Sequence, residues 1–158
     1  MDAFVIWIGS SWLHNWINLS PWAYPAMEIV HFTGLSILFG SLLLIDLRVA
    51  GFASFINMRD AMKFIPWAMF GFTLNLLSGT ALFSWSPDTF VANVGFQWKM
   101  GLIFIAGLNA LWFWFGEHTE LVKLADGEQA APAAKVIAIV SLILWLAVIS
   151  VARFMAFL

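Results

Sequence analysis

The sequence predicts an all-α protein: an integral membrane four-helix bundle with an N-terminal interfacial helix. Three observations predict this fold. Of the 158 residues 63% are hydrophobic, only 10% are charged, and four apolar stretches are each long enough to cross a bilayer. An ordinary soluble domain has roughly 25% charged residues, and a bilayer-crossing helix needs about 20 mainly apolar residues. The composition therefore excludes a typical soluble enzyme and a disordered chain.

The N-terminal segment, residues 2–19, is predicted to lie along the membrane surface. It contains three tryptophans, Trp7, Trp12 and Trp16, with polar residues between them, and tryptophan prefers the headgroup level of a bilayer. A secretory signal begins with a basic region. No Lys or Arg precedes the first apolar run here, so we expect no cleaved signal.

The four spans are predicted at about residues 26–47, 62–85, 94–115 and 134–158. The positions of two prolines agree with the predicted starts of the first and second spans, because Pro25 and Pro66 suit the first turn of a helix. Residues 86–88 (Ser-Pro-Asp) stop the second span, and Asp-Gly at 126–127 separates the third from the fourth. No long polar linker interrupts the chain, so residues 1–158 are predicted to form a single membrane domain.

Basic residues in the short loops predict the orientation. Five of the seven lie in, or at the edges of, the loops between spans one and two and between spans three and four: Arg48, Arg59, Lys63, Lys123 and Lys135. The positive-inside rule then places these loops in the cytoplasm and both termini on the outer side of the membrane. The net charge of −2 leaves no basic patch for nucleic acid, and the absence of cysteine excludes disulfides and thiolate metal sites.

This topology places ionisable side chains from different helices at one depth, near the outer leaflet. The polar residues of this layer are Glu28, His31, Thr80, Lys99 and Arg153. Glu28 and His31 lie three residues apart and therefore share one helix face. Ionisable residues inside a membrane are energetically costly and usually face the bundle interior. The layer is the predicted cofactor-binding site.

Haem b needs one or two axial ligands and contacts for two propionates. His31 is the predicted axial and metal ligand, and Lys99 and Arg153 would hold the propionates. His14 becomes the second ligand if the interfacial segment folds back; otherwise that position is taken by Met or water, or stays empty. His118 is predicted roughly 20 Å deeper, too far to reach the same iron.

A purely structural interpretation of the same residues stays open. Lys99 and Arg153 are close enough to helix ends to extend to the headgroups. Glu28 and Lys99 would then form an ion pair between helices, and His31 would be a hydrogen-bonded packing residue.

Small and amide side chains near the membrane midplane predict helix contacts. Asn75 and Asn109 are expected to hydrogen-bond to each other across helices, and the alternative is a contact to a buried quinone. Residues spaced for close packing are Gly71, Asn75 and Gly79 in the second span and Ser36 and Gly40 in the first.

At the cytoplasmic helix ends we predict a solvated rim. Asp46 and Arg48 are expected to pair with loop partners or cap helix ends. Glu117, His118 and Glu120 are metal ligands by type, but adjacent helical residues point about 100° apart, so they do not converge.

Three stretches resemble a family of small, four-helix bacterial inner-membrane proteins of unknown function: residues 22–51 (beginning WAYPAMEIVHFTG), 71–85 (GFTLNLLSGTALFSW) and 93–113 (beginning NVGFQWKMG). The resemblance covers most of residues 20–115 and rests on Tyr24-Pro25, Glu28, His31, Gly34, Gly40, Asp46-Leu47-Arg48, Gly79, Lys99 and Asn109. Family members often place a histidine where this chain has Trp114. The architecture is also similar to cytochrome b561 and copper-resistance membrane bundles. The resemblance implies the four-helix fold and says little about activity.

Three functions fit these observations, and whether the protein is an enzyme is left open. The first is a redox membrane subunit with haem b, a quinone or both, which exchanges electrons with larger membrane or periplasmic subunits. The second is a non-catalytic accessory or anchor subunit of a larger membrane complex. The expected partners are the lipid bilayer and either larger membrane or periplasmic redox subunits or further copies of the chain in a homo-oligomer. The third is a copper- or other cation-handling protein that uses Glu28 and His31.

Overall fold

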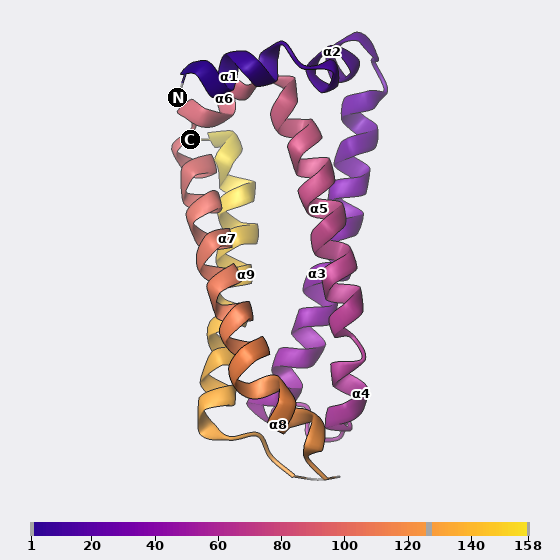
Figure 1. Cartoon of the computed structure of the whole chain (residues 1–158), viewed down its shortest axis with the longest axis vertical. Coiled ribbons are helices and arrows are strands. Elements are labelled where there is room, and N and C mark those ends of the chain that lie inside the picture. The colour runs from indigo at the N-terminus through magenta and orange to yellow at the C-terminus, as the bar shows by residue number, and fades with distance from the viewer. Residues whose placement is uncertain (1, 126–127, 158) are drawn as a thin grey trace.

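The computed structural model describes residues 2–125 and 128–157, and these residues form helices and no strand (Figure 1). Four helical segments are long and apolar enough to cross a membrane: Ala23–Ala50, Met58–Trp85, Val94–Lys123 and Pro132–Phe154. The predicted all-α fold with four spans is therefore confirmed, although each predicted boundary moves by a few residues. Leu158, the predicted end of the fourth span, lies outside the described residues.

Two of these segments are not single regular helices. The second consists of a short helix, α4 (Met58–Met62), followed by α5 (Ile65–Trp85). The third consists of α7 (Val94–Trp112), one π-helical turn (Phe113–Glu117) and α8 (His118–Lys123). The first and fourth are α3 (Ala23–Ala50) and α9 (Pro132–Phe154), and a 3-10 turn, Met155–Phe157, follows α9.

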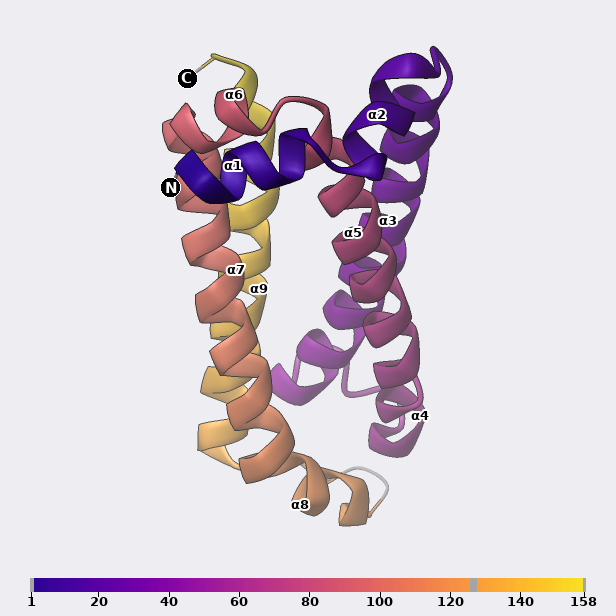
Figure 2. The ribbon, with the colours of Figure 1, turned by 45° about the horizontal axis from the view of Figure 1, so that its top comes forward.

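Three short helices lie at the end of the molecule that carries both chain termini, which we call the terminal end (Figures 1 and 2). They are α1 (Asp2–Gly9), α2 (Trp12–Leu19) and α6 (Pro87–Ala92). The predicted interfacial segment is thus two helices rather than one. The Ser11 side chain accepts a hydrogen bond from the backbone N–H of His14 and thereby caps the N-terminus of α2, which starts as a separate helix.

The four long helices form two antiparallel pairs, α3 with α5 and α7 with α9 (Figure 1). The pairs meet through α3 and α9. Five of the seven basic residues lie at the opposite end of the molecule, which we call the basic end: Arg48 near the end of α3, Arg59 in α4, Lys63 directly after α4, Lys123 at the end of α8 and Lys135 near the start of α9. Both termini thus share one end and most of the basic residues the other, which is the arrangement that the sequence predicts.

Glycine allows α3 and α5 to cross at close range. A Cβ added at Gly71 would lie 2.5 Å from the backbone nitrogen of Leu38, and one added at Gly34 would lie 2.8 Å from the Asn75 side chain. The predicted packing role of Gly71 is confirmed. Gly40 takes no part, since a Cβ there would meet nothing within 4 Å, and the partner of Gly71 in α3 is Gly34 instead.

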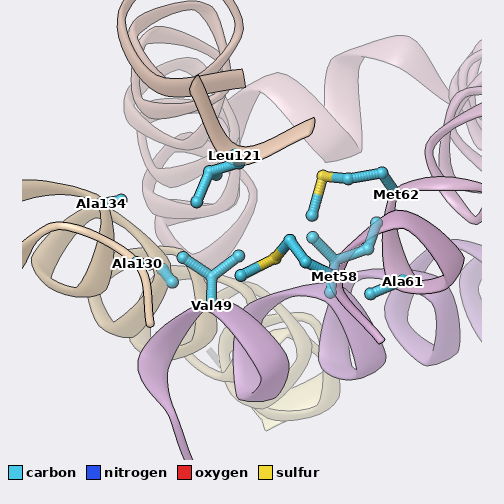
Figure 3. Close-up of a cluster of buried hydrophobic side chains, with 9 residues drawn as sticks. Val49, Met58, Ala61, Met62, Leu121, Ala130 and Ala134 are labelled. Atoms are coloured by element: carbon cyan, nitrogen blue, oxygen red, sulfur yellow. The ribbon is translucent and has the colours of Figure 1, made fainter. Parts of the chain in front are cut away.

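A hydrophobic cluster at the basic end joins the two pairs. It brings together side chains of α3, α4, α8 and α9 with Ala130, and Figure 3 shows most of them: Val49, Met58, Ala61, Met62, Leu121, Ala130 and Ala134. The π-helical turn precedes α8, which contacts α4 and buries Leu121 in the cluster. Arg48 is buried beside it, at 2% exposure. Its guanidinium donates to the backbone carbonyls of Ile56 and Glu128 and thereby ties together the two loops of this end.

Candidate functional site

The imidazole of His31 is half-buried on α3 and held against α5. Its Nδ1 lies 3.0 Å from the Ser78 hydroxyl, and that hydroxyl lies 2.5 Å from the backbone carbonyl of Leu74. A serine hydroxyl has a single proton. Because the Leu74 carbonyl can only accept, Ser78 donates to it and accepts from His31. Nδ1 therefore carries the ring proton in the neutral imidazole, and Nε2 keeps a free lone pair.

The neighbouring backbone leaves this arrangement undisturbed. The Asn75 carbonyl lies 3.5 Å from the Ser78 hydroxyl. Gly79 leaves room for the ring, since a Cβ there would lie 3.3 Å from the His31 Cε1 atom. Within the described part of the chain, no hydrogen bond engages Nε2. The second span thus orients the histidine and leaves one nitrogen available.

Lys99 brings a positive charge to this site from the other helix pair. It is half-buried on α7, and its charge acts on the imidazole of His31. Glu28, one turn from His31, is also half-buried. The ion pair expected between Glu28 and Lys99 is not formed, since the salt bridges among the described residues join Asp60 to Lys63 and Glu120 to Lys123. Neither charge is therefore neutralised by the other.

Two other predicted site residues have local partners. Arg153 is exposed near the end of α9, and its guanidinium lies 5.9 Å from the ring centre of Phe157. His14 Nδ1 donates to the Ser84 carbonyl at 2.6 Å, while Asn18 donates to the Trp85 carbonyl at 3.3 Å. These two contacts cap the C-terminal end of α5. The cofactor roles of Arg153 and His14 stay predictions.

The prediction that the two midplane amides, Asn75 and Asn109, hydrogen-bond to each other is wrong. Asn75 donates within α5 to the Gly71 carbonyl at 3.0 Å, and Asn109 donates across to the Ile137 carbonyl of α9 at 3.2 Å. The reason is the pairing of helices. Asn75 lies in the α3–α5 pair and Asn109 in the α7–α9 pair, so each finds its partner within its own pair.

His118 lies in α8 at the basic end, at the other end of the molecule from α1 and α2 (Figure 1). Its ring stacks on Trp114, with 4.5 Å between ring centres. Glu120 pairs with Lys123 at 2.7 Å on the surface. Among the described residues no three His, Asp or Glu side chains converge on a metal position.

The fold and this site define a multi-pass membrane protein with a polar cluster between its helix pairs. The cluster consists of His31, Ser78, Asn75 and Lys99, and Glu28 lies one turn from His31 on α3. Comparison of the chain with protein-family models, with curated proteins and with solved structures finds no match. The family resemblance of the sequence stays a prediction. Sequence reasoning missed Ser78 as the partner of His31, although its depth in the second span was a usable signal.

Proposed function

We propose that this protein is a redox membrane subunit that binds haem b, a quinone or both beside His31. One observation carries the proposal: Ser78 fixes the imidazole so that Nε2 offers a lone pair next to the positive charge of Lys99. The site would exchange electrons with a larger membrane or periplasmic subunit. The family resemblance of the sequence suggests a bacterial inner membrane, and the charges of the loops then favour a periplasmic position for the terminal end.

The donor set around His31 suits haem b. A histidine that ligates a metal usually donates its other ring N–H to an oxygen, which fixes its orientation and raises its basicity. His31 has this arrangement, with Nδ1–H directed at the Ser78 hydroxyl. Lys99 would pair with a propionate. Haem, when bound, supplies one-electron chemistry, and the protein contributes the ligand and the surrounding charge.

The same groups also suit a quinone. The Lys99 ammonium can donate a hydrogen bond to a quinone carbonyl, and the lone pair of His31 Nε2 can accept one from a quinol hydroxyl. The Glu28 carboxylate, one turn along α3, can accept a proton when a quinol is oxidised. Haem and quinone thus share one requirement, a hydrogen-bonding and charged site in an apolar layer.

An absorption spectrum combined with mass spectrometry of the non-protein components tests the proposal. The protein would be purified in mild detergent from cells supplied with haem precursor and containing quinone. We expect a Soret band, a quinone at fixed stoichiometry, or both. Absence of both overturns the redox proposal. Co-purification with larger subunits at fixed stoichiometry would then identify an accessory or anchor subunit.

Replacing Ser78 with alanine is expected to weaken the bound cofactor without unfolding the protein. The His31 Nδ1–H would lose its acceptor, and loss of such a partner typically lowers metal affinity about 10–100-fold. The measurement is cofactor occupancy during dilution or competition. Ser84→Ala is the matched control, because Ser84 is equally buried on α5 and its hydroxyl donates to the Thr80 carbonyl, away from His31. Equal effects in both variants would show that the Ser78 contact has no functional role.

A further inference from the structure

Asp46 is a buried carboxylate outside the proposed redox site. It lies on α3 where α3 meets α9, and its residue is only 4% exposed. The side chain interacts with the hydroxyl of Ser141 on α9, which is itself buried. Its Oδ2 atom has no hydrogen-bond partner in the described part of the chain. The expectation that Asp46 pairs with a loop partner or caps a helix end is therefore wrong.

Among the described residues, no salt bridge neutralises this carboxylate. Arg48, two residues along α3, donates to the Ile56 and Glu128 carbonyls. Lys135 of α9 donates to Gln129 at 2.6 Å and lies six residues, about 9 Å along the helix, before Ser141. Helix α5 has no titratable side chain. The charged residues of α4, Arg59 and Asp60, are exposed at the surface, and so is Lys63, which follows α4.

The energetic comparison favours the neutral acid. A buried ion without a charged partner costs more free energy than a buried hydroxyl that lacks one hydrogen bond. We propose that Asp46 and Ser141 form a proton-binding site in the contact between α3 and α9. The proton resides on Oδ2 at a mildly acidic pH at which exposed carboxyl groups are ionised, and the Ser141 hydroxyl donates to the other carboxyl oxygen.

The position of this site gives it a structural consequence. The α3–α9 contact joins the two helix pairs. Loss of the proton would therefore leave the unpaired negative charge of the Asp46 carboxylate in that contact. One turn from Ser141, the Ile137 carbonyl accepts a hydrogen bond from Asn109, which extends the polar contact to α7. Asp46 lies fifteen residues from His31, about 22 Å along α3. The proton site is thus separate from the proposed redox site and does not depend on it.

Infrared difference spectroscopy of the protein in detergent at about pH 5.5, where exposed carboxyl groups are ionised, tests this inference. We expect the spectrum of the wild type minus Asp46→Asn to contain the C=O band of one neutral carboxylic acid. The control is Asp60→Asn, because Asp60 is exposed and paired with Lys63 at 2.7 Å. The spectrum of the wild type minus that of Asp60→Asn should contain carboxylate bands instead. If the spectrum of the wild type minus that of Asp46→Asn contains carboxylate bands, the proposal is overturned.

A second variant keeps the test independent of how well Asp46→Asn folds. In Ser141→Ala the carboxyl loses its hydrogen-bond donor, so the neutral-acid band should shift to higher frequency and keep its intensity. An unchanged band in Ser141→Ala would contradict the pairing of Asp46 with Ser141. Raising the pH should convert the band to carboxylate in the wild type and leave Asp46→Asn unaffected.

Discussion

Replacing His31 with alanine is expected to reduce bound haem or quinone to background while the helices stay inserted. The change removes the Nε2 lone pair and leaves the Ser78 hydroxyl bonded within its own helix, where it already donates to Leu74. The measurement is cofactor per protein, from absorption and mass spectrometry, with helicity and gel-filtration elution as checks of the fold.

His118→Ala is the matched control for this variant. His118 stacks on Trp114 at the basic end, far from His31, so its removal should leave cofactor content unchanged. Equal loss in both variants would show that the cofactor does not bind beside His31. Copper that binds to the wild type and is lost in His31→Ala, without haem or quinone, would favour the cation-handling alternative.

Replacing Gly71 with alanine is expected to destabilise the α3–α5 pair by about 1–3 kcal/mol, the usual range for overpacking. The new Cβ would lie 2.5 Å from the Leu38 backbone nitrogen and 2.7 Å from the Gly34 carbonyl oxygen. Backbone atoms cannot move aside as a flexible side chain can, so the two helices must separate. Thermal unfolding in detergent measures the effect, and cofactor content should fall with it because α5 positions His31.

The variant Gly40→Ala distinguishes the effect of helix packing on stability from the effect of helix propensity. Alanine is about 1 kcal/mol more favourable than glycine inside a helix, and a Cβ at Gly40 meets nothing within 4 Å. This variant should therefore be neutral or stabilised, opposite in sign to Gly71→Ala. The same shift in both variants would contradict the close crossing at Gly34 and Gly71.

Much of the candidate site could be predicted from its depth alone. The spacing of Glu28 and His31 on one helix face, and the level of Lys99 on another span, follow from the helical rise and the span boundaries. The interaction of Lys99 with His31 agrees with that reasoning. The partners could not be predicted in the same way: His31 is held by Ser78, while Glu28 and Lys99 do not pair.

The amino-acid sequence by itself determined the all-α fold, the four spans and the collection of basic residues at one end. These features depend on local hydropathy, length and charge, which each segment carries regardless of its neighbours. Only the tertiary structure decided which helices pair, and with them the separation of Asn75 from Asn109 and the burial of Asp46 against Ser141. The physical reason is that side chains facing lipid and side chains facing another helix are equally apolar. Their pattern along the sequence therefore does not identify the partner helix.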